Sequence, residues 1–84
     1  CRPGEAERLV EAGETVPTGS LPINPSGGFQ SFGEATTAQG IWQVCELVVQ
    51  LRGQAGTRQV PGASVGLGQT LGLGGNGAAV VLKN

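Results

Sequence analysis

The residues best placed for chemistry lie in the stretch SFGEATTAQG, residues 31–40, where Glu34 stands between two glycines and just before an apolar helical pattern. A carboxylate in this place has two interpretations. As a general base or acid it would work from a pocket. As an acid at a helix N-terminus it would interact with the helix dipole, which is worth about 0.3–1 kcal/mol. The sequence alone favours the second interpretation, because Glu34 has no visible catalytic partner.

Other catalytic arrangements are poorly supported. The chain has no histidine, so neither a serine-type triad nor a metal site of histidine and cysteine is expected. No other acid lies between Glu14 and Glu46, whereas paired carboxylates need two acids in one place. GLGGNG, residues 72–77, is followed by a strand where a dinucleotide site requires a helix. A tight hairpin is favoured there, and backbone N–H groups lining an oxyanion pocket are the alternative.

Composition narrows the class of protein. A chain of 84 residues forms at most one domain, with a modest core. The net charge is −1 and the five basic residues are scattered, which argues against a nucleic-acid surface. No apolar run is long enough to span a membrane. Two cysteines are too few for a disulfide framework and fit a reducing cytoplasm.

The beginning of the chain also carries information. It contains no methionine and begins at Cys1, directly before a helix signal. The first helix is predicted over residues 3–13, with Pro3 at its first position and Gly13 just past its end. We therefore expect residues 1–84 to be part of a longer protein.

An uncharged loop and a strong helix follow. The loop, residues 15–33, contains three prolines and the turn-forming cluster NPSGG, and it either packs against other protein or borders a ligand. The helix is predicted over residues 36–53, with a capping box formed by Thr36 and Gln39 and a stop at Gly53. It is apolar around most of its girth, which predicts cover on several sides and a buried thiol at Cys45.

Two strands complete the predicted order of helix, loop, helix, strand and strand. ASVGLGQ, residues 63–69, and GAAVVLK, residues 77–83, are bounded by turn residues and read as strands. The continuous run AAVVL indicates a strand that is buried on both faces.

Several segments together resemble the C-terminal part of thiolases, especially those related to the sterol-carrier-protein type: RPGEAERLVEAGET, LPINPSGG, GEATTAQG, ELVVQLRGQAGTRQVPGA and GLGQTLGLGGNGAAVV. The resemblance implies an α/β protein with a five-layered α-β-α-β-α fold. Residues 1–84 would then be an incomplete portion of its C-terminal domain, with the long helix between sheets. The nucleophilic cysteine of such proteins lies in the first half of the fold, and neither Cys1 nor Cys45 matches it.

The resemblance also gives Glu34 a context. In thiolases the segment similar to GEATTAQG begins with Gly-His-Pro, and its histidine polarises the thioester oxygen. Glu34 stands at that histidine position, where an anion would repel a developing oxyanion that an imidazole could bind. Leu71 falls at or near the second catalytic cysteine, and Gln69-Thr70 replace a His-Asn pair of the sterol-carrier type.

These positions define the functional expectations. The resemblance implies a protein that handles acyl-CoA thioesters in acyl transfer or carbon–carbon bond chemistry, with thiolase activity altered or lost. The alternative is a non-catalytic thiolase-like partner or an acyl- or lipid-binding subunit. Coenzyme A thioester would be a substrate and no covalent cofactor or metal is expected. The partners would be the remainder of the chain, acyl-CoA and a homodimer or hetero-oligomer. The candidate residues are Glu34 for catalysis and, for substrate binding, Asn24, Gly27, Gly28, Gly33, Gly74 and Gly75.

Overall fold

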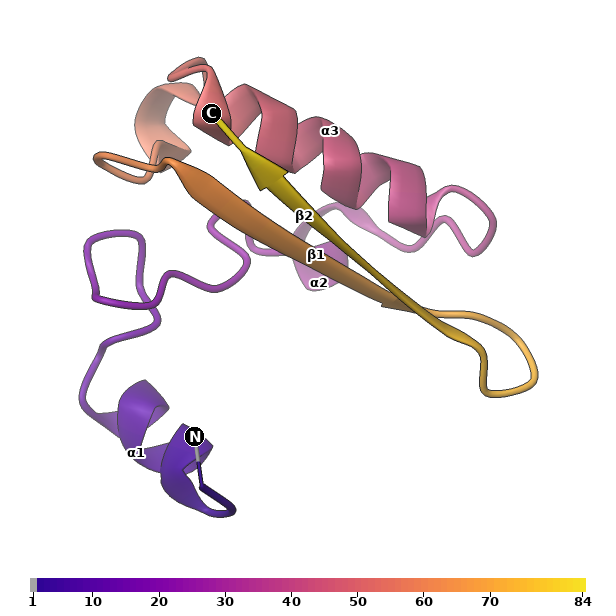
Figure 1. Cartoon of the computed structure of the whole chain (residues 1–84), viewed down its shortest axis with the longest axis horizontal. Helices are drawn as coiled ribbons and strands as arrows, with labels where there is room; N and C mark the ends of the chain where they lie inside the picture. The colour runs from indigo at the N-terminus through magenta and orange to yellow at the C-terminus, as the bar shows by residue number, and fades with distance from the viewer. Residues whose placement is uncertain (1) are drawn as a thin grey trace.

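The computed structural model describes residues 2–84, and for Phe32 the backbone only. Cys1 lies outside the described residues. The elements in chain order are α1 (Glu5–Glu11), α2 (Phe29–Phe32), α3 (Gln39–Leu51), the 3₁₀ helix η1 (Gly56–Arg58), β1 (Val65–Leu71) and β2 (Gly77–Lys83). Figure 1 shows α3 lying along the β1–β2 hairpin, with α1 set apart from both. The predicted α/β class is confirmed.

The two longer helices end in the same way. Gly13 and Gly53 follow α1 and α3 with φ of 72° and 69°, in the left-handed region that glycine adopts most easily. Each glycine N–H bonds the carbonyl three residues back, and the following N–H bonds the carbonyl five residues back. This pairing is the Schellman motif, which satisfies the last helical carbonyls. Both predicted C-terminal stops are confirmed.

The predicted start of the long helix is wrong. Helix α3 begins at Gln39, with Ala38 as its N-cap and no side-chain capping bond, so the capping box of Thr36 and Gln39 does not form. The Gln39 amide instead donates to Glu34 Oε1 at 2.9 Å. Local side-chain bonding of this kind competes with helix capping, and the N-cap of α3 lies two residues later than the box predicts.

The two strands form an antiparallel hairpin in which Leu67 lies opposite Val81 and Gly68 opposite Val80. The bounds of β2 match the predicted strand, but β1 begins two residues later than predicted. Gly62 has a φ of 69°, and Ala63 N–H bonds the Val60 carbonyl. This turn takes the residues before Ser64 out of the extended conformation.

Glycines on the inner face of β1 allow α3 to approach closely. A Cβ added at Gly66 would lie 2.7 Å from Leu47 Cδ2. One added at Gly68 would lie 3.3 Å from Leu47 Cδ1 and 3.2 Å from Val80 Cγ1. Glycine in a strand interior often marks such a close backbone approach. The packing of helix on hairpin therefore depends on the absence of side chains at these two positions.

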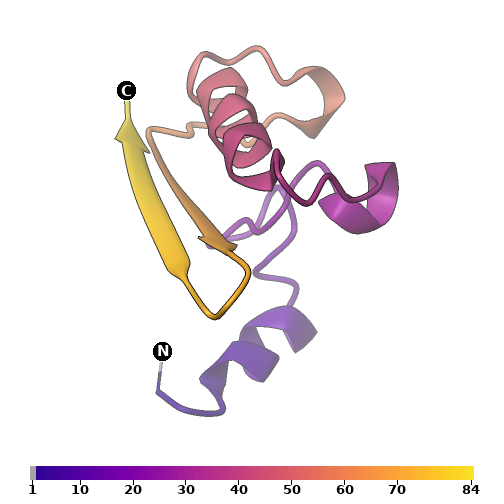
Figure 2. The same cartoon turned by 90° about the vertical axis from the view of Figure 1, so that its right-hand side faces the viewer.

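The described chain covers only one face of the hairpin and one face of α3. Figure 2 shows α3 on one side of the strands, with no helix of the described residues on the other. Leu67 and Val81 on the open face are 67% and 64% exposed, and Ile41 on α3 is 68% exposed. Within the described chain β2 is therefore half-buried on one face and open on the other, where burial on both faces was predicted. Cys45 is exposed where a buried thiol was predicted.

The long loop between α1 and α3 is held by local hydrogen bonds. The Glu14 carboxylate accepts from Ser20 N–H at 3.0 Å, and its carbonyl accepts from Leu21 N–H at 2.9 Å. The bonds from Ser20, side chain first and backbone second, lower the pKa of Glu14. The short helix α2 was not predicted; Phe29 at its start contacts Trp42 on α3, with ring centroids 6.2 Å apart. Among residues 2–84, no helix has both the length and the apolar character to cross a bilayer.

The close approach of helix to strand can be tested by adding a side chain at Gly68. We expect Gly68→Val to destabilise the intact protein by about 1–3 kcal/mol, because the new methyl groups collide with Leu47 and Val80. Gly77→Val is the matched control, since a Cβ there meets only Leu71 Cδ2, at 3.7 Å, and the Thr70 carbonyl, at 3.9 Å. Its effect should stay within about 0.5 kcal/mol. Equal denaturation midpoints for the two variants would contradict the packing described above.

Candidate functional site

A surface groove lies where the start of α3 meets the end of β1. Its volume is about 460 Å³, within the roughly 300–1,000 Å³ of small-molecule sites. We call it the α3–β1 groove. The residues that line it are Thr36, Thr37, Gln39, Gly40, Ile41, Val44, Thr70, Leu71 and Gly72.

The groove exists because the first turn of the helix contains a glycine beside the strand. A Cβ at Gly40 would lie 3.6 Å from Thr70 Cγ2, so the first turn of α3 sits directly against the end of β1. Gly72, at the other wall, also has no side chain to fill the space. A smaller space of about 160 Å³ adjoins it, since Gly40, Val44 and Thr70 line both. Small residues at both walls therefore leave room for a ligand.

The walls of the groove are uncharged and mostly apolar, with a few polar groups among them. Thr36, Thr37 and Thr70 bring hydroxyl groups, which both donate and accept hydrogen bonds, and Gln39 brings an amide. No acidic or basic residue is among the lining residues. The groove itself therefore offers hydrogen bonding and apolar contact, and no general acid or base.

Glu34 lies at the edge of this groove without lining it. Its side chain is exposed, and one carboxylate oxygen accepts from Gln39, a wall residue. Among the residues that the structure describes, no Lys or Arg lies within ion-pair distance of Glu34. The carboxylate is thus fixed through one oxygen and has no neutralising cation nearby.

The other candidate residues identified from the sequence occupy turns outside the groove. Asn24, Gly27 and Gly28 form a turn in which Gly27 N–H bonds the Asn24 carbonyl at 2.8 Å and all three have positive φ. Gly33 immediately precedes Glu34, with φ of 91°.

Gly74 and Gly75 lie in the exposed loop that joins the two strands, with φ of 81° and 83°. Of these glycines, only Gly33 is close to the groove, because it is next to Glu34 in the sequence. The structure does not gather the glycines around one pocket. The positive φ values account for glycine at these positions without a ligand.

The sequence did not indicate the residues that line the groove. The three threonines and Gly40 carry no catalytic pattern, and Gln39 was assigned to a helix cap. The available signal was the glycine at the start of an otherwise apolar helix, since such a residue often marks a close packing contact.

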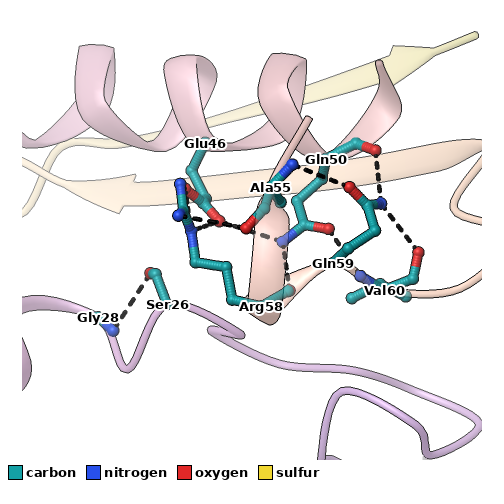
Figure 3. A network of polar contacts seen from close by, with 8 residues as sticks. All are labelled: Ser26, Gly28, Glu46, Gln50, Ala55, Arg58, Gln59 and Val60. Carbon is teal, nitrogen blue, oxygen red and sulfur yellow. Dashed lines mark hydrogen bonds and ion pairs between the residues drawn. The ribbon is translucent and has the colours of Figure 1, made fainter. Parts of the chain in front are cut away.

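A polar network fixes the opposite end of α3 (Figure 3). Gln50 is only 5% exposed, and its amide donates to the Arg58 carbonyl at 2.8 Å and accepts from Val60 N–H at 2.9 Å. Gln59 completes the arrangement: it accepts from Ala55 N–H at 3.0 Å and donates to the Gln50 carbonyl at 2.9 Å. Two glutamines therefore satisfy the backbone of the connection between α3 and β1.

An ion pair extends this network to the surface. The Arg58 guanidinium donates to both carboxylate oxygens of Glu46, from Nε to Oε1 at 3.0 Å and from Nη2 to Oε2 at 3.0 Å. The hydrogen bond from Arg58 lowers the pKa of Glu46 and outweighs the opposing effect of partial burial. The same bond raises the pKa of Arg58. These contacts are structural and lie away from the groove.

A metal centre has no support in the described part of the chain. No group of three or more His, Cys, Asp or Glu side chains that could hold an ion occurs among residues 2–84.

Comparison with known proteins identifies the family. The model of the family described as "Thiolase C-terminal domain-like" matches residues 1–84. The chain belongs to this thiolase C-terminal domain-like family. The family that the sequence resembled is thereby confirmed.

Several relatives share most of this thiolase-like chain. Sterol carrier protein 2 of Rattus norvegicus is 52% identical over 96% of the chain, and acetyl-CoA acetyltransferase of Methanothermobacter thermautotrophicus is 48% identical over 92%. Non-specific lipid-transfer protein-like 2 of Caenorhabditis elegans is 40% identical over 92% of it. The matched regions are 14%, 20% and 19% of these relatives, so the thiolase-like chain spans only a minor part of their length.

Replacing the buried amide tests the polar network. Gln50→Leu keeps the approximate volume but leaves the Val60 N–H without its partner, so we expect a loss of about 1–3 kcal/mol in the stability of the intact protein. Gln54→Leu is the matched control, because Gln54 is exposed and makes no side-chain hydrogen bond within residues 2–84. Denaturant titration should separate the two variants, and equal stabilities would show that the network contributes nothing.

The ion pair predicts a dependence of stability on pH. Because folding lowers the pKa of Glu46 below its ordinary value of 4.5, its contribution is full above that value and is lost as the pH falls through the folded pKa. Glu46→Gln should therefore lower the melting temperature of the intact protein at neutral pH, and the difference should vanish in acid. Glu11→Gln on α1 is the control. A difference that grows as the pH falls would reverse the assigned sign.

Proposed function

We propose that residues 1–84 are part of a thiolase-like protein that handles acyl-CoA thioesters, and that the α3–β1 groove borders the reacting end of the thioester. One observation carries the proposal. Leu71 lines the groove, and Gln39, on the opposite wall, holds Glu34. By the resemblance, Glu34 stands at the position of the catalytic histidine of thiolases, and Leu71 stands at or near that of their second catalytic cysteine.

The names of the relatives support the substrate class. One relative is named as an acetyl-CoA acetyltransferase, and others as sterol carrier and lipid-transfer proteins. Acyl thioesters and lipids both carry apolar hydrocarbon, and the groove offers Ile41, Val44 and Leu71 to such a group. We therefore assign coenzyme A thioester as a substrate of the whole protein and not as a bound cofactor.

The residues at the two positions argue for altered chemistry. A carboxylate at position 34 accepts hydrogen bonds and cannot donate one to a developing oxyanion as an imidazole can. Leu71 has no thiol to act as acid or nucleophile. We infer that ordinary thiolysis is lost, and that the protein performs a different carbon–carbon or acyl-transfer reaction.

A second candidate function is a non-catalytic subunit that binds acyl groups or lipids. The observation that favours it is the absence of any ionisable side chain among the lining residues of the groove. In this case Glu34 would act only as an acid near the start of α3.

The uncovered apolar faces support partners for the described chain. Leu67, Val81 and Ile41 are each more than 60% exposed, and contiguous exposed apolar surface marks sites of protein contact. We infer that the remainder of a thiolase-like chain covers these faces. We further infer a homodimer or hetero-oligomer in the reducing cytoplasm.

Two measurements on the intact protein test the proposal. We expect acetyl-CoA to bind and thiolysis of a panel of 3-ketoacyl-CoA substrates to be absent, because positions 34 and 71 lack the required donor and thiol. Gly40→Leu should weaken acetyl-CoA binding by filling the groove, whereas Gly77→Leu, outside the groove, should not. Robust thiolysis would overturn the altered chemistry, and failure to bind acetyl-CoA would overturn the thioester assignment.

A further inference from the structure

The bond between Glu34 and Gln39 closes the loop that forms one wall of the groove. Gln39 Nε2 donates to Glu34 Oε1 at 2.9 Å, and Thr36 and Thr37, which line the groove, lie between the two residues. Neither side chain caps α3, whose N-cap is Ala38 without a side-chain bond. The pair therefore orders the rim of the groove and is not used to start the helix.

The pair leaves one carboxylate oxygen available. Among residues 2–84, Glu34 Oε2 has no hydrogen-bond partner, and no cation lies within ion-pair distance. As a carboxylate, Glu34 accepts hydrogen bonds and donates none. Gln39 has already committed an N–H to this carboxylate. The edge of the groove consequently carries an acceptor of negative charge beside the wall residue Gln39.

The side chains of the groove walls do not discriminate between ligands that donate and ligands that accept hydrogen bonds. The hydroxyls of Thr36, Thr37 and Thr70 either donate or accept, so they do not separate one class of ligand from the other. The carboxylate does. A ligand hydroxyl can donate to it in a charge-assisted hydrogen bond, whereas a ketone oxygen is an acceptor and is left facing an acceptor.

We propose that Glu34 is a specificity-determining residue and Gln39 its positioning residue, and that together they favour thioesters whose acyl group carries a hydroxyl over those that carry a ketone at the same carbon. The proposal rests on the proposed function, since it assumes that a thioester occupies the groove. It goes further by naming the acyl group that the rim selects and the residue that holds the selecting carboxylate in place.

The experiment compares two probes that differ only at this carbon. Binding of 3-hydroxybutyryl-CoA and acetoacetyl-CoA to the intact protein is measured by calorimetry, and the ratio of their dissociation constants is the readout. We expect the hydroxyacyl thioester to bind about fivefold more tightly, the scale of one net hydrogen bond at an accessible site. Effects of the shared coenzyme A portion cancel in the ratio.

Variants separate positioning from simple packing. Glu34→Gln supplies both a donor and an acceptor, so the ratio should fall to about one. Gln39→Leu keeps a side chain on the groove wall but removes the donor, and it should lower the ratio as well. Gln39→Lys retains a donor of similar reach and should preserve most of the preference. Glu7→Gln, an exposed change on α1, is the control for charge and should leave the ratio unchanged.

The outcomes distinguish this inference from the proposed function. An unchanged ratio in Glu34→Gln, or tight binding of both probes with a ratio of one in the unmodified protein, would overturn the inference and leave thioester binding standing. A ratio that survives in Gln39→Leu would overturn the positioning role of Gln39. Binding of neither probe would overturn the proposed function and the inference with it. Circular dichroism and melting temperatures confirm that each variant is folded.

Discussion

The packing of α3 against β1 is the contact on which the described structure depends. Helix α3 is the only helix that packs on the hairpin among residues 2–84, and Gly66 and Gly68 let Leu47 reach the strand. Apolar side chains at these positions would enlarge the interior but push the helix away. In a chain whose buried residues are so few, closeness of backbone replaces the bulk of a conventional core.

This contact also determines where the groove lies. Because α3 packs on β1, its first turn meets the end of the strand, with Gly40 against Thr70. The loop before the helix then forms one wall and the start of the hairpin loop forms the other. Leu71 in the wall and Glu34 at the edge of the groove, far apart in the sequence, are thereby brought to the same end of α3.

The sequence predicted the features that depend on local backbone chemistry. Gly13 and Gly53 end their helices because the left-handed conformation is easy for glycine, and the run from Gly77 to Lys83 is a strand as expected. The sequence did not predict the contacts of individual side chains correctly. Gln39 matched a helix cap but bonds Glu34, and Cys45 matched a buried position but faces outward. The groove was not predicted because small residues create it, and an empty space between elements has no sequence pattern that would indicate it.

The two ends of α3 hold the chain by different means, and this difference bears on function. At the C-terminal end, Gln50 and Gln59 bind backbone groups of the connecting loop, so their hydrogen bonds leave little freedom to change. At the N-terminal end, contact relies on the absence of a side chain at Gly40. The bond between Glu34 and Gln39 orders the rim, together with the backbone bond from Ala38 N–H to the Ala35 carbonyl. Substitutions at the rim therefore alter the chemistry presented to a ligand without breaking the contacts that hold the helix to the hairpin. A chain built in this way can change the residue at position 34 and keep its fold.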